Sequence, residues 1–170
     1  MEKGCGGIPS TEKVNYSINV SMEKSHYEIL INASREKVWD TMLEDATYRE
    51  WTRIFNADSH YIGDWSQGSK ILFVGSGEDG EQGGMVARIK ENRKYEFISI
   101  EHLGMIKNGI EDTTSEEVRS WTPAFENYTF TEKDGGVLLE VDMEISADFK
   151  AMFDDFWPQS LKVLKVLAEK

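Results

Sequence analysis

The chain has 170 residues, enough for one domain whose core needs no disulfide or metal for stability. Its net charge is −12, from 19 Lys and Arg against 31 Asp and Glu, and it has no basic run. This composition argues against nucleic-acid and anionic-membrane partners. The single cysteine, Cys5, excludes an intramolecular disulfide and a metal site built from cysteines.

The first 24 residues are polar and glycine-rich, which predicts a flexible leader ahead of one domain over residues 25–170. The leader lacks the apolar stretch of a secretory signal. No apolar run elsewhere approaches the ~20 residues of a membrane-spanning helix. We therefore expect a cytoplasmic protein without membrane insertion.

The domain is predicted to open with a strand followed at once by a helix. Residues 25–31 alternate apolar and polar side chains, which is typical of a strand. In the run INASREKVWDTML, Ser34 is a suitable N-cap and Trp39 lies on the apolar face of the helix that follows. A second short helix is expected at residues 48–51.

The middle of the chain shows the period-two pattern of β-strands, interrupted by turn signals. The predicted strands are residues 59–62, 70–74, 85–91, 95–102, 125–131 and 137–145. The connections are too tight for crossover helices between consecutive strands. An antiparallel meander of about six or seven strands, counting the first, is therefore expected in an α+β fold.

Two connections are long enough to need an explanation. Residues 75–84 (GSGEDGEQGG) lack the Gly-Lys-Ser/Thr ending of a phosphate loop and are followed by a strand, so we interpret them as a hairpin connection. Residues 107–123 are expected to form either a lid over a cavity or a solvated loop.

The C-terminal residues 148–168 carry a wide apolar stripe, which predicts a long amphipathic helix. Pro158 predicts either a kink or a short helix running into a longer one that starts near Trp157. One such helix is too narrow to cover the concave face of a twisted sheet of this size. The uncovered part is expected to be filled by large side chains or to form a cavity for a small apolar ligand.

Few residues suggest catalysis or metal binding. His26, His60 and His102 stand singly without metal-ligand spacing, so we predict no metal and no cofactor. No motif for a covalent nucleophile is present. One side chain of Glu101-His102 is expected to point inward, where it can act as an acid or base. The alternative is a solvated Glu beside a hydrogen-bonded His.

Four segments resemble the START-like (SRPBCC, birch-pollen-allergen-like) superfamily. INASREKVW resembles its opening strand–helix signature. Three further segments resemble the branch related to the activator of the heat-shock-protein-90 ATPase: Trp51 with Gly63-Asp64-Trp65-x-x-Gly68-Ser69, Glu126-Asn127-Tyr128-Thr129-Phe130, and Phe156-Trp157-Pro158-x-x-Leu161-x-x-Leu164-Lys165. The resemblance covers about residues 25–169. It implies a helix-grip fold, in which an antiparallel sheet wraps around the C-terminal helix with a hydrophobic cavity between them.

The superfamily includes lipid carriers, hormone receptors, polyketide cyclases and co-chaperone domains. Our first expectation is non-enzymatic binding of a small hydrophobic or amphipathic molecule, such as a lipid, an aromatic or a polyketide-like compound. The predicted lining residues are Trp39, Trp51, Phe73, Met85, Phe97, Tyr128, Met143, Phe153, Phe156 and Trp157.

Two alternatives remain. One is a cyclase- or dehydratase-type enzyme acting in the same cavity, with His102, Glu101, His60 and Tyr128 as the catalytic candidates. The other is a co-chaperone-like stimulator of a heat-shock-protein-90 ATPase, with the chaperone as its partner. A monomer or weak dimer is expected in each case.

Overall fold

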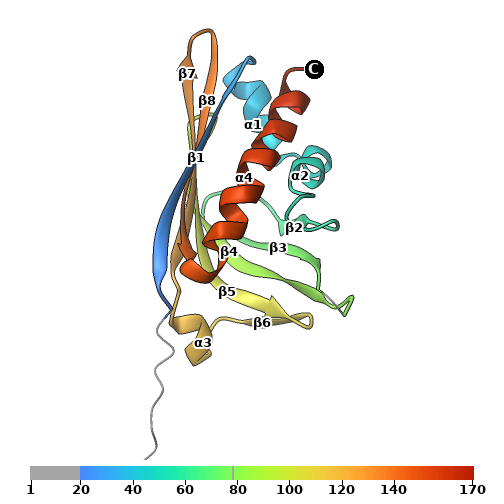
Figure 1. Ribbon diagram of the computed structural model, residues 1–170, viewed down its shortest axis with the longest axis vertical. Helices are drawn as coiled ribbons and strands as arrows, with labels where there is room; N and C mark the ends of the chain where they lie inside the picture. The colour runs from blue at the N-terminus through green and yellow to red at the C-terminus, as the bar shows by residue number, and fades with distance from the viewer. Residues whose placement is uncertain (1–19, 78) are drawn as a thin grey trace, which may run out of the picture.

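The computed structural model describes residues 20–77 and 79–170 (Figure 1). It has eight strands: β1 (Met22–Ile31), β2 (His60–Gly63), β3 (Lys70–Ser76), β4 (Gln82–Arg93), β5 (Phe97–Lys107), β6 (Ile110–Asp112), β7 (Ala124–Lys133) and β8 (Gly136–Ser146). Its helices are α1 (Arg35–Leu43), α2 (Asp45–Trp51), α3 (Glu116–Arg119) and α4 (Ala147–Ala168). The strands form one curved antiparallel sheet that wraps around α4, which confirms the predicted α+β helix-grip fold.

The strand order is β1-β8-β7-β5-β4-β3-β2, and β6 pairs with β5. All strands predicted from the sequence are present, and the meander from β2 onward is confirmed. The first strand lies beside the last, with Met22 opposite Ser146 and Ile31 opposite Val137. The segment expected to be a lid or loop contains β6 and α3. These two elements are too short to produce a periodic signal in the sequence.

The junction after β1 forms as the sequence predicts. The side chain of Ser34 accepts a hydrogen bond from the backbone N–H of Lys37 at 3.2 Å, which caps α1. Val38, Trp39 and Met42 form the buried face of α1. The predicted leader lies mostly outside the described residues, as does Cys5, and β1 already begins at Met22.

Helix α4 is a single helix through Pro158, so the second of the two alternatives, a short helix running into a longer one, is wrong. Proline removes one intrahelical hydrogen bond, but contacts beside it hold the helix in place. Trp157 is only 3% exposed, and Ser160 Oγ donates a hydrogen bond of 2.6 Å to the carbonyl of Trp51. Within the described part of the chain, no helix is long and apolar enough to cross a membrane.

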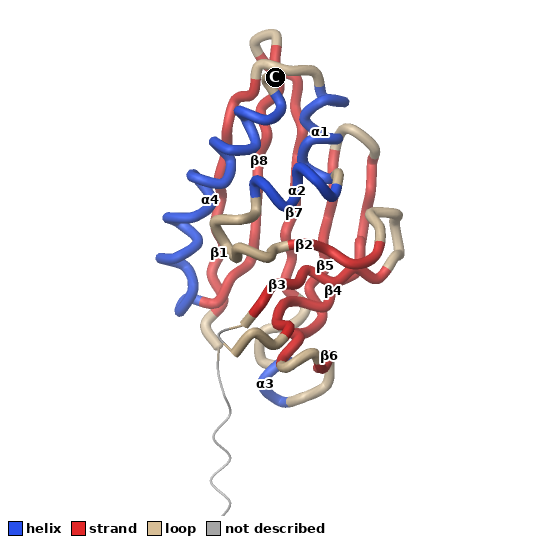
Figure 2. The backbone as a smooth tube through the Cα atoms, turned by 90° about the vertical axis from the view of Figure 1, so that its right-hand side faces the viewer, coloured by secondary structure: helices blue, strands red, loops and turns tan. Residues whose placement is uncertain are grey.

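Helix α4 covers one side of the concave face. It packs mainly on β1, α1 and α2, and less on β8. In Figure 2 it runs along the β1 side of the sheet, while β3, β4 and β5 lie on the other side of the view. The inward-facing side chains of β3–β5 therefore receive little cover from α4, and several of them are only half-buried.

Strands β3 and β4 approach each other closely at Gly84. Its φ is +146°, and a Cβ at this position would overlap the carbonyl oxygen of Phe73. We expect Gly84→Ala to lower the free energy of unfolding by about 2 kcal/mol or more, because the backbone is strained and the strands must separate. Gly83→Ala is the matched control, since its nearest atom would be at an ordinary 3.7 Å. Equal losses for both variants in urea denaturation would contradict this explanation.

Candidate functional site

Three polar side chains meet on the concave face of the sheet. His102 on β5 places Nε2 at 2.9 Å from Oε2 of Glu126 on β7, and the hydroxyl of Tyr128 donates a hydrogen bond to Oε1 of the same carboxylate. The register of the two strands, with Ile100 opposite Glu126, brings them together. His102 is 8% exposed and Tyr128 is 2% exposed. We call His102, Glu126 and Tyr128 the polar trio.

The trio is a carboxylate with two donors in a nearly dry environment. Burial, and secondarily the charge of Glu126, raises the pKa of Tyr128 well above its ordinary value, so this hydroxyl stays protonated. Burial and the same carboxylate also raise the pKa of Tyr48 on α2. Both tyrosines therefore remain neutral at physiological pH.

Only one of the two ring nitrogens of His102 takes part in the trio. With Nε2 bonded to Glu126, the tautomer inferred from the hydrogen bonding leaves Nδ1 as an acceptor. Nδ1 is buried and has no hydrogen-bond partner among the described residues, and the same is true of Trp157 Nε1 on α4. Because buried polar atoms nearly always have a partner, each of these nitrogens could bind a polar atom of a ligand or a water molecule.

The surroundings of the trio are aromatic and apolar. The Phe73 ring lies 5.9 Å from the His102 ring, and Trp157 lies 6.3 Å from Tyr128 between ring centroids. Phe73 faces Met85 across the β3–β4 ladder, and both are only half-buried. A polar trio beside partly exposed apolar side chains can hold the polar end and the apolar body of one small molecule.

The structure places the predicted lining residues in several regions. Trp51, Tyr128 and Trp157 form a buried aromatic centre, with Trp51 and Trp157 at 5.9 Å between ring centroids. Phe153 and Phe156 are half-buried on α4 and both contact Phe55.

Three predicted lining residues lie elsewhere. Trp39 packs against Phe130 under α1, at 5.1 Å between ring centroids. Met143 is 8% exposed on β8 and belongs to the main core. Phe97 alternates with the inward-facing Ile98 and so lies on the convex face, where the guanidinium of Arg93 sits 4.7 Å above its ring.

The structure separates the catalytic candidates. Only His102 and Tyr128 come together, and both do so through Glu126. Glu101 lies on the convex face, where Arg88 Nη2 is 2.6 Å from its carboxylate. His60 lies on β2, with Nδ1 2.7 Å from the carbonyl of Asp58. Glu126 is not among the predicted site residues, although a charged residue in register with buried Ala124 and Tyr128 was a detectable signal.

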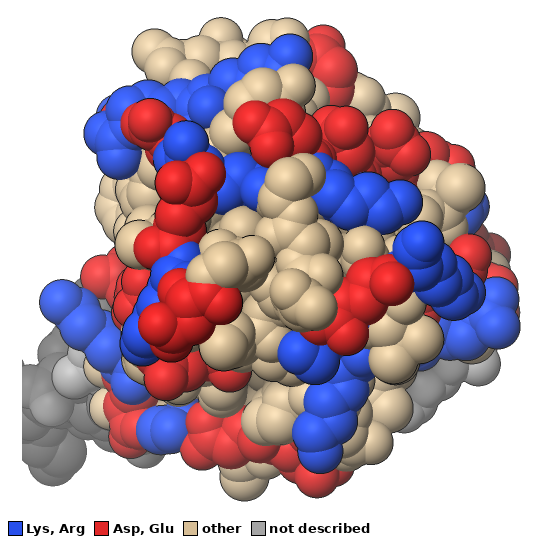
Figure 3. All heavy atoms as spheres, turned by 90° about the horizontal axis from the view of Figure 1, so that it is seen from above, with Lys and Arg blue, Asp and Glu red and all other residues tan. Residues whose placement is uncertain are grey.

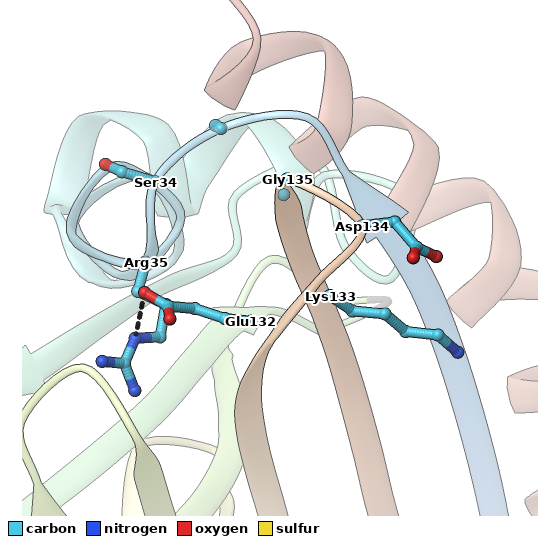
Figure 4. Close-up of a pocket in the computed structure, with 8 residues that line it drawn as sticks. Ser34, Arg35, Glu132, Lys133, Asp134 and Gly135 are labelled. Carbon is cyan, nitrogen blue, oxygen red and sulfur yellow. Dashed lines mark ion pairs between the residues drawn. The ribbon is translucent and has the colours of Figure 1, made fainter.

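Two surface hollows lie away from the trio. One, of about 360 Å³, lies between the start of α1 and the β7–β8 turn, where Arg35 Nε pairs with Glu132 at 3.4 Å. Figure 4 shows Lys133 and Asp134 pointing away from that ion pair. The other, of about 390 Å³, is lined by Arg49, Arg53, Ala57, Asp58, Ser59 and His60.

The charges at the α1 end of the molecule are mixed. Figure 3 views the molecule from above and shows acidic and basic side chains interleaved around an uncharged centre. The visible face therefore has no extended patch of one sign.

A curved antiparallel sheet wrapped around a C-terminal helix is the helix-grip arrangement of START-like proteins. The model of the family described as "Activator of Hsp90 ATPase homolog 1-like protein" matches residues 32–169, and the chain belongs to this family. A comparison with curated proteins gives no match.

Solved structures with the same fold come from several bacteria. An uncharacterised protein from Rhizobium leguminosarum is 12% identical with a TM-score of 0.67, over 88% of this chain and 96% of the other. The Mll3558 protein from Rhizobium loti is 14% identical with a TM-score of 0.66, over 87% and 98%. The Aha1 dimer from Colwellia psychrerythraea is 18% identical with a TM-score of 0.63, over 86% and 96%. At these identities the likeness concerns the fold alone.

Proposed function

We propose that this chain binds a small hydrophobic or amphipathic molecule on the concave face, between α4 and strands β3–β5. The observation that carries the proposal is the buried Nδ1 of His102, which has no partner among the described residues although it lies within an aromatic layer. A ligand hydroxyl or amide N–H would complete this acceptor. The apolar remainder of the ligand would cover Phe73 and Met85.

The half-buried side chains support an entry route from the β3–β5 side. Phe73 on β3 and Met85 on β4 are only partly covered, and so are Phe153, Phe156 and Phe55, which contact one another at α4. Since the concave face is filled by side chains, binding requires these aromatic rings to move apart. A lipid, an aromatic or a polyketide-like compound with one polar end suits such a site.

The test is a ligand screen with fatty acids, sterols and hydroxylated aromatics, read by thermal shift and tryptophan fluorescence. A ligand present at 100 times its Kd should stabilise the protein by about 2.7 kcal/mol. We expect His102→Phe to weaken binding of hydroxylated ligands, because the acceptor is lost. His60→Phe is the matched control, since His60 lies outside the trio. The absence of any hit across the three ligand classes would contradict the proposal.

A second candidate function is acid–base catalysis in the same place. It is favoured by the convergence of His102 and Tyr128 on the Glu126 carboxylate, which could orient His102 as a proton acceptor. Any ligand that binds should then be checked for turnover by mass spectrometry. An unchanged ligand after prolonged incubation would favour a pure binding protein.

The family assignment supports a third candidate, stimulation of a heat-shock-protein-90 ATPase. Its test is an ATPase assay with the chaperone of the same cell, together with pull-down at low and physiological salt. Binding without ligand, and a raised ATPase rate, would favour this function over small-molecule binding. No interaction at either salt concentration would eliminate it.

A further inference from the structure

A histidine and three carboxylates gather on the convex face of the β1–β8 pair, opposite α4. The strand register places His26 opposite Asp142 and Glu28 opposite Glu140. One potential ligand atom from each of His26, Glu28 and Glu140 lies within 4.8 Å of the others. We propose that this cluster binds a divalent transition-metal ion through His26 Nε2 and the carboxylates of Glu28 and Glu140, with Asp142 orienting the imidazole.

A carboxylate orients the imidazole of His26. Its Nδ1 lies 2.7 Å from Asp142 Oδ1, a distance at which the ring N–H donates to the carboxylate. This bond orients the ring, and Nε2 offers its lone pair to a metal ion when the imidazole is neutral. Metal-binding histidines are commonly held in this way, by a carboxylate on the nitrogen that does not bind the metal.

The Nε2 atom of His26 faces a second potential ligand. It points to the neighbouring acid on the same strand, with Oε2 of Glu28 at 3.4 Å. Ligand atoms around a tetrahedral Zn²⁺ are about 3.3 Å apart, given metal–ligand distances of about 2.0–2.1 Å. The pair already has the required spacing. Glu140 has only to swing inward, which a partly exposed glutamate can do.

The cluster carries an excess of negative charge. Glu28 lies directly opposite Glu140, and like charges in this relation destabilise a sheet. In the described part of the chain, His26 is the only basic side chain that forms an ion pair with Glu28 or Asp142, and none forms one with Glu140. A bound cation would neutralise this concentration of negative charge.

The donor set indicates the class of metal. One imidazole nitrogen with two carboxylate oxygens suits Zn²⁺ and related transition ions better than Mg²⁺ or Ca²⁺, which prefer oxygen ligands alone. The ion would join an edge strand, β1, to the last strand of the sheet. Metal binding should therefore also stabilise the pairing of β1 with β8.

The experiment is calorimetric titration of the full chain with Zn²⁺ after chelator treatment, in a Cys5→Ser background that removes the only thiol. We expect one bound ion and a rise in Tm. His26→Ala should weaken binding at least tenfold, and Asp142→Asn by about 10–100-fold, as for other residues that orient a metal ligand. His60→Ala is the matched control and should bind like the parent.

Two outcomes would overturn the proposal. One is no binding at Zn²⁺ concentrations well above that of the protein, and the other is binding that His26→Ala leaves unchanged. An NMR spectrum of the imidazole nitrogens supplies a second measurement, in which Zn²⁺ should shift Nε2 of His26 in the parent. Because His26 is about half exposed, its replacement should leave the fold intact, which circular dichroism can verify.

Discussion

Replacing Trp157 with alanine is expected to lower the free energy of unfolding by about 3–5 kcal/mol. The indole is 3% exposed and lies where α4 meets the sheet and α2. Its ring centroids are 5.9 Å from those of Tyr27 and Trp51, 5.2 Å from that of Phe55 and 6.3 Å from that of Tyr128. Alanine would leave a cavity that four rings on different elements cannot fill together. Total stabilities of about 5–15 kcal/mol are usual, so the variant should be close to unfolding.

The measurement is urea denaturation followed by circular dichroism, with Val166→Ala as the control on the same helix. Val166 is 61% exposed, so its truncation should change the free energy of unfolding by less than about 0.5 kcal/mol. Trp157→Phe should fall between the two, because it keeps a ring and removes the buried unpartnered N–H. Similar stabilities for Trp157→Ala and Val166→Ala would show that α4 is not anchored by this residue.

Replacing Glu126 with leucine is expected to destabilise the protein by about 2–4 kcal/mol, even though leucine is the more apolar residue. Glu126 accepts hydrogen bonds from Tyr128 and His102, and both donors are buried. Without the carboxylate each donor loses its partner inside the protein, at a cost of about 1–3 kcal/mol apiece. Glu132→Leu on the same strand is the control, because its side chain is 74% exposed.

A double mutant makes this prediction sharper. Tyr128→Phe should destabilise the parent protein, since it removes a hydrogen bond to a charged group, by about 1.5–3 kcal/mol. In the Glu126→Leu background the same change should be neutral or stabilising, because it removes a hydroxyl that no longer has an acceptor. Additive losses in urea denaturation would refute the description of the trio as a coupled unit.

Much of the fold could be predicted because its signals are local. Alternation along residues 137–145 reflects one buried face of β8, and Ser34 caps α1 through a side chain three residues from its partner. The unbroken course of α4 through Pro158 was not predictable in this way. It depends on Ser160 and Trp157 reaching residues more than 100 positions away in sequence.

The candidate site shows the same division more strongly. His102 and Tyr128 were recognisable as side chains capable of proton transfer. The alternation of β7 marked Glu126 only as a charged residue on a buried face, and not as the partner of both. Glu126 is separated from His102 by 24 positions, and only the pairing of β5 with β7 brings the two together. The proposed metal site is an extreme case, because His26 and Asp142 are 116 positions apart.

The sequence by itself determined the class of fold, because strand alternation, an amphipathic final helix and a capped first helix are periodic or short-range features. It also determined which reactive side chains the protein contains, including three histidines and one cysteine. Only the tertiary structure decided which of these groups meet. Strand register assigns Glu101 to the convex face and His102 to the concave face, and the pairing of β5 with β7 brings His102 to Glu126.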